Sequence, residues 1–350
     1  MSANAPLDVA VIGFGKLGLL HAGLFNVLPG SRLAAAVDSN ATLLKALKPR
    51  LPQVRFHTDH RALLAEGGID AAVIATPTAS HVAIAADCVR AGVPVLIEKP
   101  LAVSADQAGP LLAALGERPM PTMVGYMGRY AATFAKARAI VASGALGRLH
   151  MVRASMYSGQ LLRPGKGWRY DPAVSGGGVL NTQACHLVDA LLWLFGGVDR
   201  VSGHTTRLYS AAVEDHVHAV LAFRSGLRGH LDASWSARHH RTPVIAIHVQ
   251  GESGTLDVDD DRVRLFLDAA AGPYPAGWSE WLKPDLYQGV AFDIGGPQYT
   301  LQAQAFLAAV RGGPAPESDV RSALATQRVI DAIYASAARD GVPVAVEGEA

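Results

Sequence analysis

The sequence predicts a chain of two domains: an α/β domain with a doubly wound parallel sheet, followed by an α+β domain with a large, mostly antiparallel open sheet. Short apolar runs alternate with helix-like stretches over the first 125 residues, whereas single apolar and polar residues alternate after about residue 145. The 350 residues also exceed the usual size of one domain. We therefore expect domains at 1–125 and 126–350, with C-terminal helices free to pack back on the first.

The apolar runs of the first domain are near-continuous, which is typical of parallel strands covered by helices on both faces. These runs lie at 9–13, 33–38, 70–77, 93–100 and 121–126. Helix-like stretches lie between or after them at 17–28, 39–51, 60–67, 79–92 and 104–119. Strand and helix therefore alternate, which predicts right-handed crossovers and a doubly wound sheet.

The second domain shows the period-2 alternation of antiparallel strands with one less buried face. The alternating segments lie at 148–158, 200–210, 216–236 and 244–267. One helical stretch at 182–196 interrupts this series, and a helix-rich segment at 299–338 closes it. Residues 270–296 are rich in Gly and Pro, and we expect a long irregular loop there.

Composition and charge exclude several classes of protein. Lys and Arg number 31 and Asp and Glu 30, so a net charge of +1 gives no general reason to expect nucleic acid or an anionic membrane as partner. Two cysteines exclude a disulfide scaffold and a thiolate-rich zinc site. The sequence shows neither a signal peptide nor a run of 18 apolar residues. We expect a cytoplasmic protein.

The first strand-to-helix turn carries a dinucleotide-binding fingerprint. Gly13, Gly15 and Gly18 have the G-x-G-x-x-G spacing of a Rossmann domain, directly after an apolar strand and at the start of a helix. The helix N-terminus offers N–H groups to a pyrophosphate. Asp38 ends the next strand, where a carboxylate accepts hydrogen bonds from ribose hydroxyls and repels a 2′-phosphate. We therefore expect NAD, with NADP less favoured.

Glu98 and Lys99 follow another buried strand, at the sheet edge where doubly wound folds bind ligands. Pro100 comes next and restricts the backbone of Lys99. A lysine in this place can be partly desolvated, which lowers its pKa towards that of a general base. The alternative interpretation is a surface or structural ion pair.

Three segments together resemble the Gfo/Idh/MocA oxidoreductase family, which includes glucose–fructose oxidoreductase and inositol dehydrogenase. They are GFGKLGLLH from Gly13, DAAVIATPTASHVAIAADCVRAGVPVLIEKPLAVSADQA from Asp70 and SGGGVLNTQACHLVDALLWLFG from Ser175. The resemblance covers essentially the whole chain and extends to VGYMGRY, GESGTLDVDD and AIYASAARDGVPVAV. The EKP segment at 98–100 is its most specific part.

The resemblance implies that Lys99 is a catalytic or substrate-orienting residue and that the Lys99–Pro100 peptide bond is cis. It also implies that His186 faces the nicotinamide pocket as a catalytic residue. Spacing alone places His186 on one helix face with Thr182, and Asp189 within reach to orient the imidazole or to pack. Relatives often carry Asp at the position of Thr182, whose hydroxyl does not titrate near neutral pH. Lys99 and His186 therefore remain alternative proton carriers.

The remaining candidates surround these residues. Arg129 follows the last strand of the first domain, and relatives carry an arginine–aromatic pair there. Trp168 and Arg169 lie on a loop where an aromatic ring can cover a sugar face, although surface packing is the alternative. The expected substrate-binding residues are Lys99, Arg129, Tyr157, Trp168, Arg169, Thr182 and His186. The expected cofactor-binding residues are Gly13, Phe14, Gly15, Lys16, Leu17, Gly18, Asp38, Thr76, Pro77, His81, Glu98 and Lys99.

We therefore expect an NAD(P)-dependent oxidoreductase that transfers a hydride between nicotinamide and a carbinol carbon of a sugar, inositol or related polyol. Two alternatives stay open: an elimination or hydrolysis with transient internal oxidation, and a non-catalytic nucleotide-sensing regulator. We expect a homodimer or homotetramer through the open sheet. His216 and His218 share a strand face, but no convincing metal spacing occurs, and we expect no metal. The loops at 158–175 and 270–296 are expected to decide the substrate.

Overall fold

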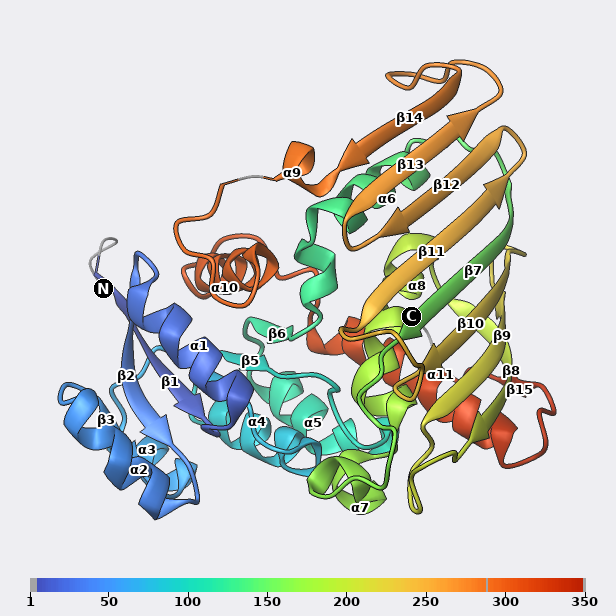
Figure 1. Cartoon of the computed structure of the whole chain (residues 1–350). Coiled ribbons are helices and arrows are strands. Elements are labelled where there is room, and N and C mark those ends of the chain that lie inside the picture. Colours follow the sequence, from blue (N-terminus) through green and yellow to red (C-terminus); the bar gives the residue numbers. More distant parts are fainter. Residues whose placement is uncertain (1–4, 288, 349–350) are drawn as a thin grey trace. The chain divides into compact units, whose positions relative to one another are not determined.

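The computed structural model of the chain describes residues 5–287 and 289–348, which form two compact units (Figure 1). Among these residues, unit 1 is made of 5–102, 106–127 and 289–323. Unit 2 is made of 103–105, 128–287 and 324–348. This division is not contiguous in the sequence, because the segment 289–323 returns to the first unit.

Unit 1 contains a six-stranded parallel sheet in the order β3-β2-β1-β4-β5-β6. The strands are β1 (Leu7–Ile12), β2 (Ser31–Val37), β3 (Arg55–His57), β4 (Ala71–Ile74), β5 (Val95–Ile97) and β6 (Thr122–Val124). The order reverses between β1 and β4, and ligands of such sheets bind outside the carboxyl ends of the strands at this place. The predicted doubly wound sheet is confirmed. The strand β3 was missed because its three residues are half-buried and form no apolar run.

The helices of unit 1 cover this sheet. They are α1 (Lys16–Val27), α2 (Ala41–Leu47), α3 (His60–Glu66), α4 (His81–Arg90), α5 (Gly109–Glu117) and α10 (Pro297–Val310). The helix α10 comes from the far end of the chain and packs on α1, where the Phe25 and Phe306 rings meet edge to face at 6.5 Å. The Val124 N–H also donates to the Ser318 carbonyl at 2.6 Å. Unit 1 therefore combines the first part of the chain with the distant segment 289–323.

Unit 2 contains a nine-stranded sheet in the order β14-β13-β12-β11-β7-β10-β9-β8-β15 (Figure 1). Its strands are β7 (Leu149–Tyr157), β8 (Val198–Thr206), β9 (His216–Phe223), β10 (Arg228–Ser234), β11 (Val244–Gly251), β12 (Gly254–Asp259), β13 (Arg262–Leu267), β14 (Gly277–Leu282) and β15 (Val344–Ala345). All described pairs are antiparallel except β10 with β7. The predicted, mostly antiparallel open sheet is confirmed.

Helices lie against one face of this sheet and leave the other open. Among the helices of unit 2, α6 (Ala132–Ala142) contacts β12 and β13, and α8 (Cys185–Phe195) contacts β7. The others are α7 (Pro172–Ser175), α9 (Lys283–Leu286) and most of α11 (Val320–Ala337). Along β9, residues alternate between buried and more exposed, as expected for a sheet covered on one face. The open face carries a hollow of about 540 Å³ lined in part by Arg153, Asp232 and His248.

The expected irregular loop at 270–296 is partly wrong. It contains β14, which pairs with β13, and the short helix α9. The alternation of β14 was hidden because Gly and Pro flank it and its outward residues include Trp278 and Leu282, which are apolar but exposed. Over the described parts of the chain, no helix combines the length and the apolar character needed to cross a bilayer.

Candidate active site

The glycine turn of unit 1 joins β1 to α1 and leaves room at its outer side. A Cβ on Gly18 would lie 1.8 Å from the Gly13 carbonyl oxygen, so helix and turn approach as closely as glycine permits. A Cβ on Gly15 would meet no described atom within 4 Å. Gly15 is also the N-cap of α1, and no side-chain cap bonds to the N–H groups there. The turn therefore offers uncapped donors and open space, which fits a pyrophosphate.

Asp38 borders this turn from the end of β2. Its Oδ2 accepts a hydrogen bond from the Phe14 N–H at 2.7 Å, and its Oδ1 accepts one from the Asn40 N–H at 2.8 Å. These bonds fix the carboxylate beside the glycine turn. Each oxygen keeps acceptor capacity for a ribose hydroxyl. The side chains of Lys16 and Leu17, also predicted to bind cofactor, lie in the exposed first turn of α1.

His81 ties the ends of β4 and β5 together. The imidazole is buried at the start of α4, with Nδ1 2.9 Å from the Pro100 carbonyl oxygen and Nε2 2.8 Å from the Thr76 carbonyl oxygen. Burial lowers the pKa of His81, against the opposing effect of these two carbonyls. The Thr76 hydroxyl in turn accepts a hydrogen bond from Ser80. His81 thus holds the Thr76 and Pro100 backbones in place through their carbonyl groups. Pro77, also predicted to bind cofactor, is exposed.

Glu98 has a partner that the sequence analysis missed. Its Oε1 lies 2.7 Å from Nε2 of His21, and both side chains are buried. Burial by itself would raise the pKa of Glu98, but His21, Lys99 and His81 outweigh it and hold that pKa below its usual value. The signal for His21 was weak, because a histidine on the buried face in the second turn of a helix is usually an ordinary core residue. Nδ1 of His21 has no hydrogen-bond partner among the described residues.

Lys99 lies two residues after the end of β5 and is half-buried. The Lys99–Pro100 peptide bond is cis, which the resemblance had implied. The Lys99 N–H donates to Oε2 of Glu98 at 3.3 Å. Because β1, β4 and β5 are parallel, their carboxyl ends meet at one edge of the sheet. Lys99, Asp38 and the glycine turn therefore belong to the same edge of unit 1.

In unit 2, Thr182 and His186 lie on consecutive helical segments. The predicted single α-helix is corrected: Leu180–Ala184 is π-helical, and α8 begins at Cys185. The Thr182 hydroxyl donates to the Gly178 carbonyl at 2.7 Å and is mostly buried. His186 is half-buried in the first turn of α8. Thr182 uses its hydroxyl hydrogen inside its own segment and keeps only acceptor capacity.

A buried carboxylate holds the start of this segment. Glu214 accepts hydrogen bonds from the Gly178 N–H at 2.8 Å, from the Leu180 N–H at 2.9 Å and from the Tyr334 hydroxyl at 2.8 Å. Burial raises the pKa of Glu214, although these donors oppose it. A Cβ on Gly178 would lie 1.7 Å from the Glu214 carbonyl oxygen, so glycine is required there. Nothing in the sequence around Glu214 indicated this role.

Arg129 and Asp189 form an ion pair inside unit 2. Two guanidinium nitrogens of Arg129 lie 2.9 Å and 2.6 Å from the two carboxylate oxygens of Asp189, and both side chains are buried. The Thr326 hydroxyl adds a bond to Asp189 at 3.3 Å. Asp189 thus pairs with Arg129. A substrate-binding role of Arg129 stays a prediction, and its bidentate partner fixes the guanidinium plane.

Of the other predicted substrate residues, Tyr157 lies on the sheet face opposite the helix that carries His186. Tyr157 ends β7 on the open face of the sheet, where it lines the hollow and its ring lies 5.3 Å from that of His240. Burial and the neighbouring Asp232 raise the pKa of Tyr157 to about 12. The helix α8 lies against the opposite face. Trp168 and Arg169 stack on one another, with the guanidinium 4.7 Å from the indole centroid.

Two family descriptions match this chain. The family described as an oxidoreductase family with an NAD-binding Rossmann fold matches residues 7–126. The GFO/IDH/MocA C-terminal domain matches residues 134–257. The two matches fall on the parallel sheet of unit 1 and on the first part of unit 2.

Several relatives with assigned activities align with nearly the whole chain. D-apiose dehydrogenase of Paraburkholderia graminis is 27% identical over 95% of this chain and 88% of its own length. D-xylose 1-dehydrogenase (NADP(+)) 2 of Haloferax volcanii is 29% identical over 93% and 97%. Inositol 2-dehydrogenase 1 of Saccharopolyspora erythraea is 28% identical over 97% and 96%. These relatives are dehydrogenases of sugars or inositol.

Solved structures share the fold. Levoglucosan dehydrogenase in complex with NADH and L-sorbose superposes with a TM-score of 0.88 at 21% identity, covering 99% of this chain and 100% of that one. GenD2 from gentamicin A biosynthesis, in complex with NAD, superposes with a TM-score of 0.83 at 28% identity, covering 99% and 98%. The first supports the fold alone, because its identity is low.

Proposed function

The chain belongs to the GFO/IDH/MocA family of oxidoreductases, and from that premise we propose that it oxidises or reduces a carbinol carbon of a sugar, inositol or related polyol with NAD. One observation carries the proposal: the open glycine turn, Asp38 and Lys99 belong to one edge of the parallel sheet in unit 1. A nucleotide pocket and a titratable amine at the same edge are what a dehydrogenase requires.

The residues around the turn fit a dinucleotide. Gly13, Gly15 and Gly18 would hold the pyrophosphate against the N-terminus of α1, and Asp38 would accept hydrogen bonds from the ribose hydroxyls. The carboxylate of Asp38 would repel a 2′-phosphate, so we infer a preference for NAD. The relatives differ in this respect, since the Haloferax volcanii enzyme is named for NADP. The preference therefore follows from Asp38 and not from the relatives.

When bound, nicotinamide supplies hydride chemistry at its C4 atom. Lys99 would accept the hydroxyl proton of the substrate during oxidation and donate it during reduction. The buried Glu98 sits beside Lys99 and is itself fixed by His21, so the strand end that presents the amine is rigid. The Thr182 hydroxyl does not titrate near neutral pH, which leaves His186 as the second candidate for proton transfer.

The test replaces Lys99 with alanine and measures turnover and NAD affinity separately on a panel of aldoses, inositols and related polyols. We expect turnover to fall by about 10²–10⁴-fold while the dissociation constant for NAD stays within a few-fold. Lys45→Ala, on the exposed side of α2, serves as the control and should keep full turnover. Turnover of Lys99→Ala close to wild type would refute the role of this amine.

The same panel separates the two other functions that the sequence leaves open. Product formed without net NADH would indicate elimination or hydrolysis with internal oxidation. NAD binding without turnover of any compound, together with a stable complex with another protein, would indicate a regulator. Either result would replace the dehydrogenase proposal but keep the nucleotide site.

The same proposal includes a homodimer or homotetramer formed through the open face of the unit 2 sheet. Four large apolar side chains are exposed on the outward positions of its strands, where a second copy would cover them. They are Val220, Val244, Trp278 and Leu282. Light scattering should give a mass of two or four chains, and Trp278→Glu should lower it. A monomeric wild-type chain would contradict this part.

A further inference from the structure

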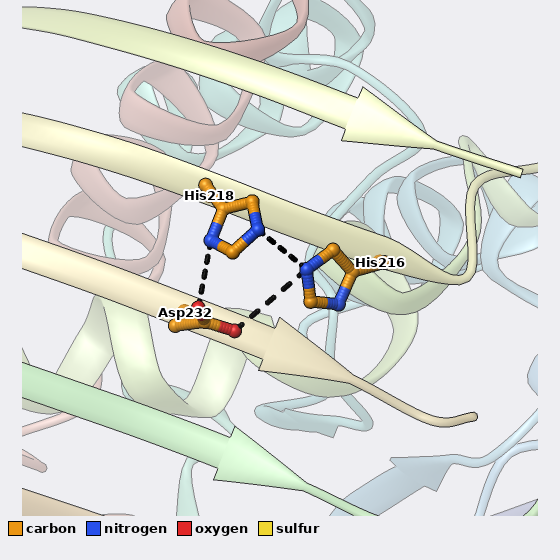
Figure 2. Close-up of side chains that lie close together, drawn as sticks. All are labelled: His216, His218 and Asp232. Carbon is orange, nitrogen blue, oxygen red and sulfur yellow. Dashed lines mark hydrogen bonds and ion pairs between the residues drawn. The ribbon is translucent and has the colours of Figure 1, made fainter. Parts of the chain in front are cut away.

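Three metal-ligating side chains meet on the open face of the unit 2 sheet. The strands β9 and β10 are antiparallel, with His218 directly opposite Asp232. His216 lies two residues before His218 and therefore on the same face. Figure 2 shows the two imidazole rings and the carboxylate turned towards one another across the two strands. The sequence indicated the two histidines, but the third group comes from another strand.

The distances among these side chains are short. Nε2 of His216 lies 2.6 Å from Nε2 of His218, and Nδ1 of His218 lies 2.7 Å from Oδ2 of Asp232. Oδ1 of Asp232 is 4.0 Å from Nε2 of His216. One ligand atom from each residue falls within 4.8 Å of the others. All three groups are thus within reach of a single ion.

Hydrogen bonding within the cluster leaves groups unsatisfied. If His218 donates its Nδ1 hydrogen to Asp232, its Nε2 carries a bare lone pair that faces the Nε2 of His216. Oδ1 of Asp232 is buried and has no assigned hydrogen-bond donor among the described residues, and the Tyr157 hydroxyl is a further polar neighbour of this carboxylate besides the two histidines. A buried carboxylate oxygen without a partner is costly, so it points to a ligand that is not a protein group.

Charge and accessibility also suit a cation. Metal ligation requires neutral imidazole rings, and with both rings neutral the carboxylate gives the cluster a charge of −1. In the single chain the His218 side chain is 56% exposed and that of Asp232 31%, so an ion and a water ligand can reach the cluster before a second copy covers this face.

We propose that His216, His218 and Asp232 bind one divalent transition-metal ion that links β9 to β10 on the open sheet face. Imidazole nitrogens favour Zn²⁺, Co²⁺ and Ni²⁺ over Mg²⁺ or Ca²⁺. Three protein ligands leave a fourth position for water. In a tetrahedral site the two ligating nitrogens lie ~3.3 Å apart, so the rings must separate by less than about 1 Å. The ion would hold neighbouring strands and needs neither nucleotide nor substrate.

The test uses the full chain without a histidine tag, stripped with a chelator and titrated with Co²⁺ or Zn²⁺. We expect one ion per chain by elemental analysis, a visible Co²⁺ absorption band and a higher melting temperature. Asp232→Asn and His218→Ala should each weaken metal binding by at least ~100-fold. This exceeds the ~10–100-fold loss expected when a residue only hydrogen-bonds to a metal ligand. His230→Ala is the matched control, since His230 is an exposed histidine on the same face of β10 and should bind normally.

Three results would overturn the proposal. The first is binding of less than one ion per chain, and the second is metal binding that is unchanged in both Asp232→Asn and His218→Ala. The third is a loss of metal affinity in His230→Ala as large as in those two variants. Because one variant could unfold, circular dichroism of each stripped protein is compared first, and the conservative Asp232→Asn decides if His218→Ala fails to fold. The readout involves no turnover, so it stands or falls separately from the dehydrogenase activity.

Discussion

Each unit contains a glycine-rich helix start, and the two treat their backbone donors in opposite ways. At the β1–α1 turn no side-chain cap bonds to the N–H groups, and the space at Gly15 is open. At the start of the π-helical segment, Glu214 accepts hydrogen bonds from the N–H groups of Gly178 and Leu180. The first turn is left for a ligand, and the second is filled by the protein itself.

This difference shows that glycines alone do not identify a ligand site. Both segments have glycines because backbones approach closely, at Gly18 in one unit and at Gly178 in the other. What separates them is the place of the carboxylate. Asp38 sits at a strand end beside its turn, whereas Glu214 lies over the N–H groups of its own. Three sets of substitutions test whether the two turns differ in this way.

The largest expected effect comes from adding one methyl group to each turn. Gly178→Ala places a Cβ against the Glu214 backbone, so we expect a loss of about 3 kcal/mol or more in the free energy of unfolding. Gly15→Ala meets open space and should change stability by less than about 1 kcal/mol. It should instead weaken NAD binding by at least about tenfold, because the methyl group occupies the place of the pyrophosphate.

Urea unfolding and calorimetric titration with NAD measure these two effects. A stable Gly178→Ala protein would show that Glu214 does not fill the second turn. Unchanged NAD affinity in Gly15→Ala would show that the first turn does not receive the nucleotide.

The second prediction concerns the carboxylate beside the open turn. Asp38→Ala removes the charge that repels a 2′-phosphate, so the preference for NAD over NADP should fall by about tenfold, or about 1.4 kcal/mol. The ratio of kcat/KM for the two cofactors measures this preference. Asp59→Ala, at the N-cap of α3, is a control that should leave the ratio unchanged. A wild-type enzyme that prefers NADP would contradict the charge argument outright.

The smallest effect is a difference in pH dependence between the two buried carboxylates. The pKa of Glu98 is lowered, so its contribution to stability is complete above the ordinary value of 4.5 and is lost as the pH falls through the lowered pKa. The pKa of Glu214 is raised, so its contribution is complete below 4.5 and is lost as the pH rises through the raised pKa.

Over about pH 3 to 7, the destabilisation caused by Glu98→Gln should therefore grow as the pH rises towards 4.5 and stay constant above it, whereas that caused by Glu214→Gln should stay constant below 4.5 and shrink as the pH rises above it. Unfolding midpoints across this range give both slopes. Glu252→Gln, in an exposed pair with Arg148, should show an effect within about 0.5 kcal/mol throughout. If the destabilisation changed with pH in the same direction in both variants, the opposite pKa shifts of Glu98 and Glu214 would be refuted.

The sequence predicted the features that depend on local pattern. Continuous apolar runs gave the parallel strands, alternation gave the open sheet, and spacing gave the turn at Gly13–Gly18. It could not predict pairings between distant residues, such as His21 with Glu98 or Asp189 with Arg129, because no local pattern encodes them. Most of the fold can therefore be predicted from the sequence. The residues that hold the candidate site residues in place, such as His21 beside Glu98, become apparent only from the tertiary structure.

The return of α10 to unit 1 has a consequence for how the protein is made. Phe306 packs on Phe25, and the Ser318 carbonyl accepts a hydrogen bond from the Val124 N–H. Unit 1 therefore lacks part of its core until about residue 323 has left the ribosome. During translation, the first 127 residues must wait with Phe25 uncovered while residues 128–288, the larger part of unit 2, are synthesised. We expect this nascent chain to depend on chaperones, and a fragment that ends at residue 127 to aggregate when expressed alone.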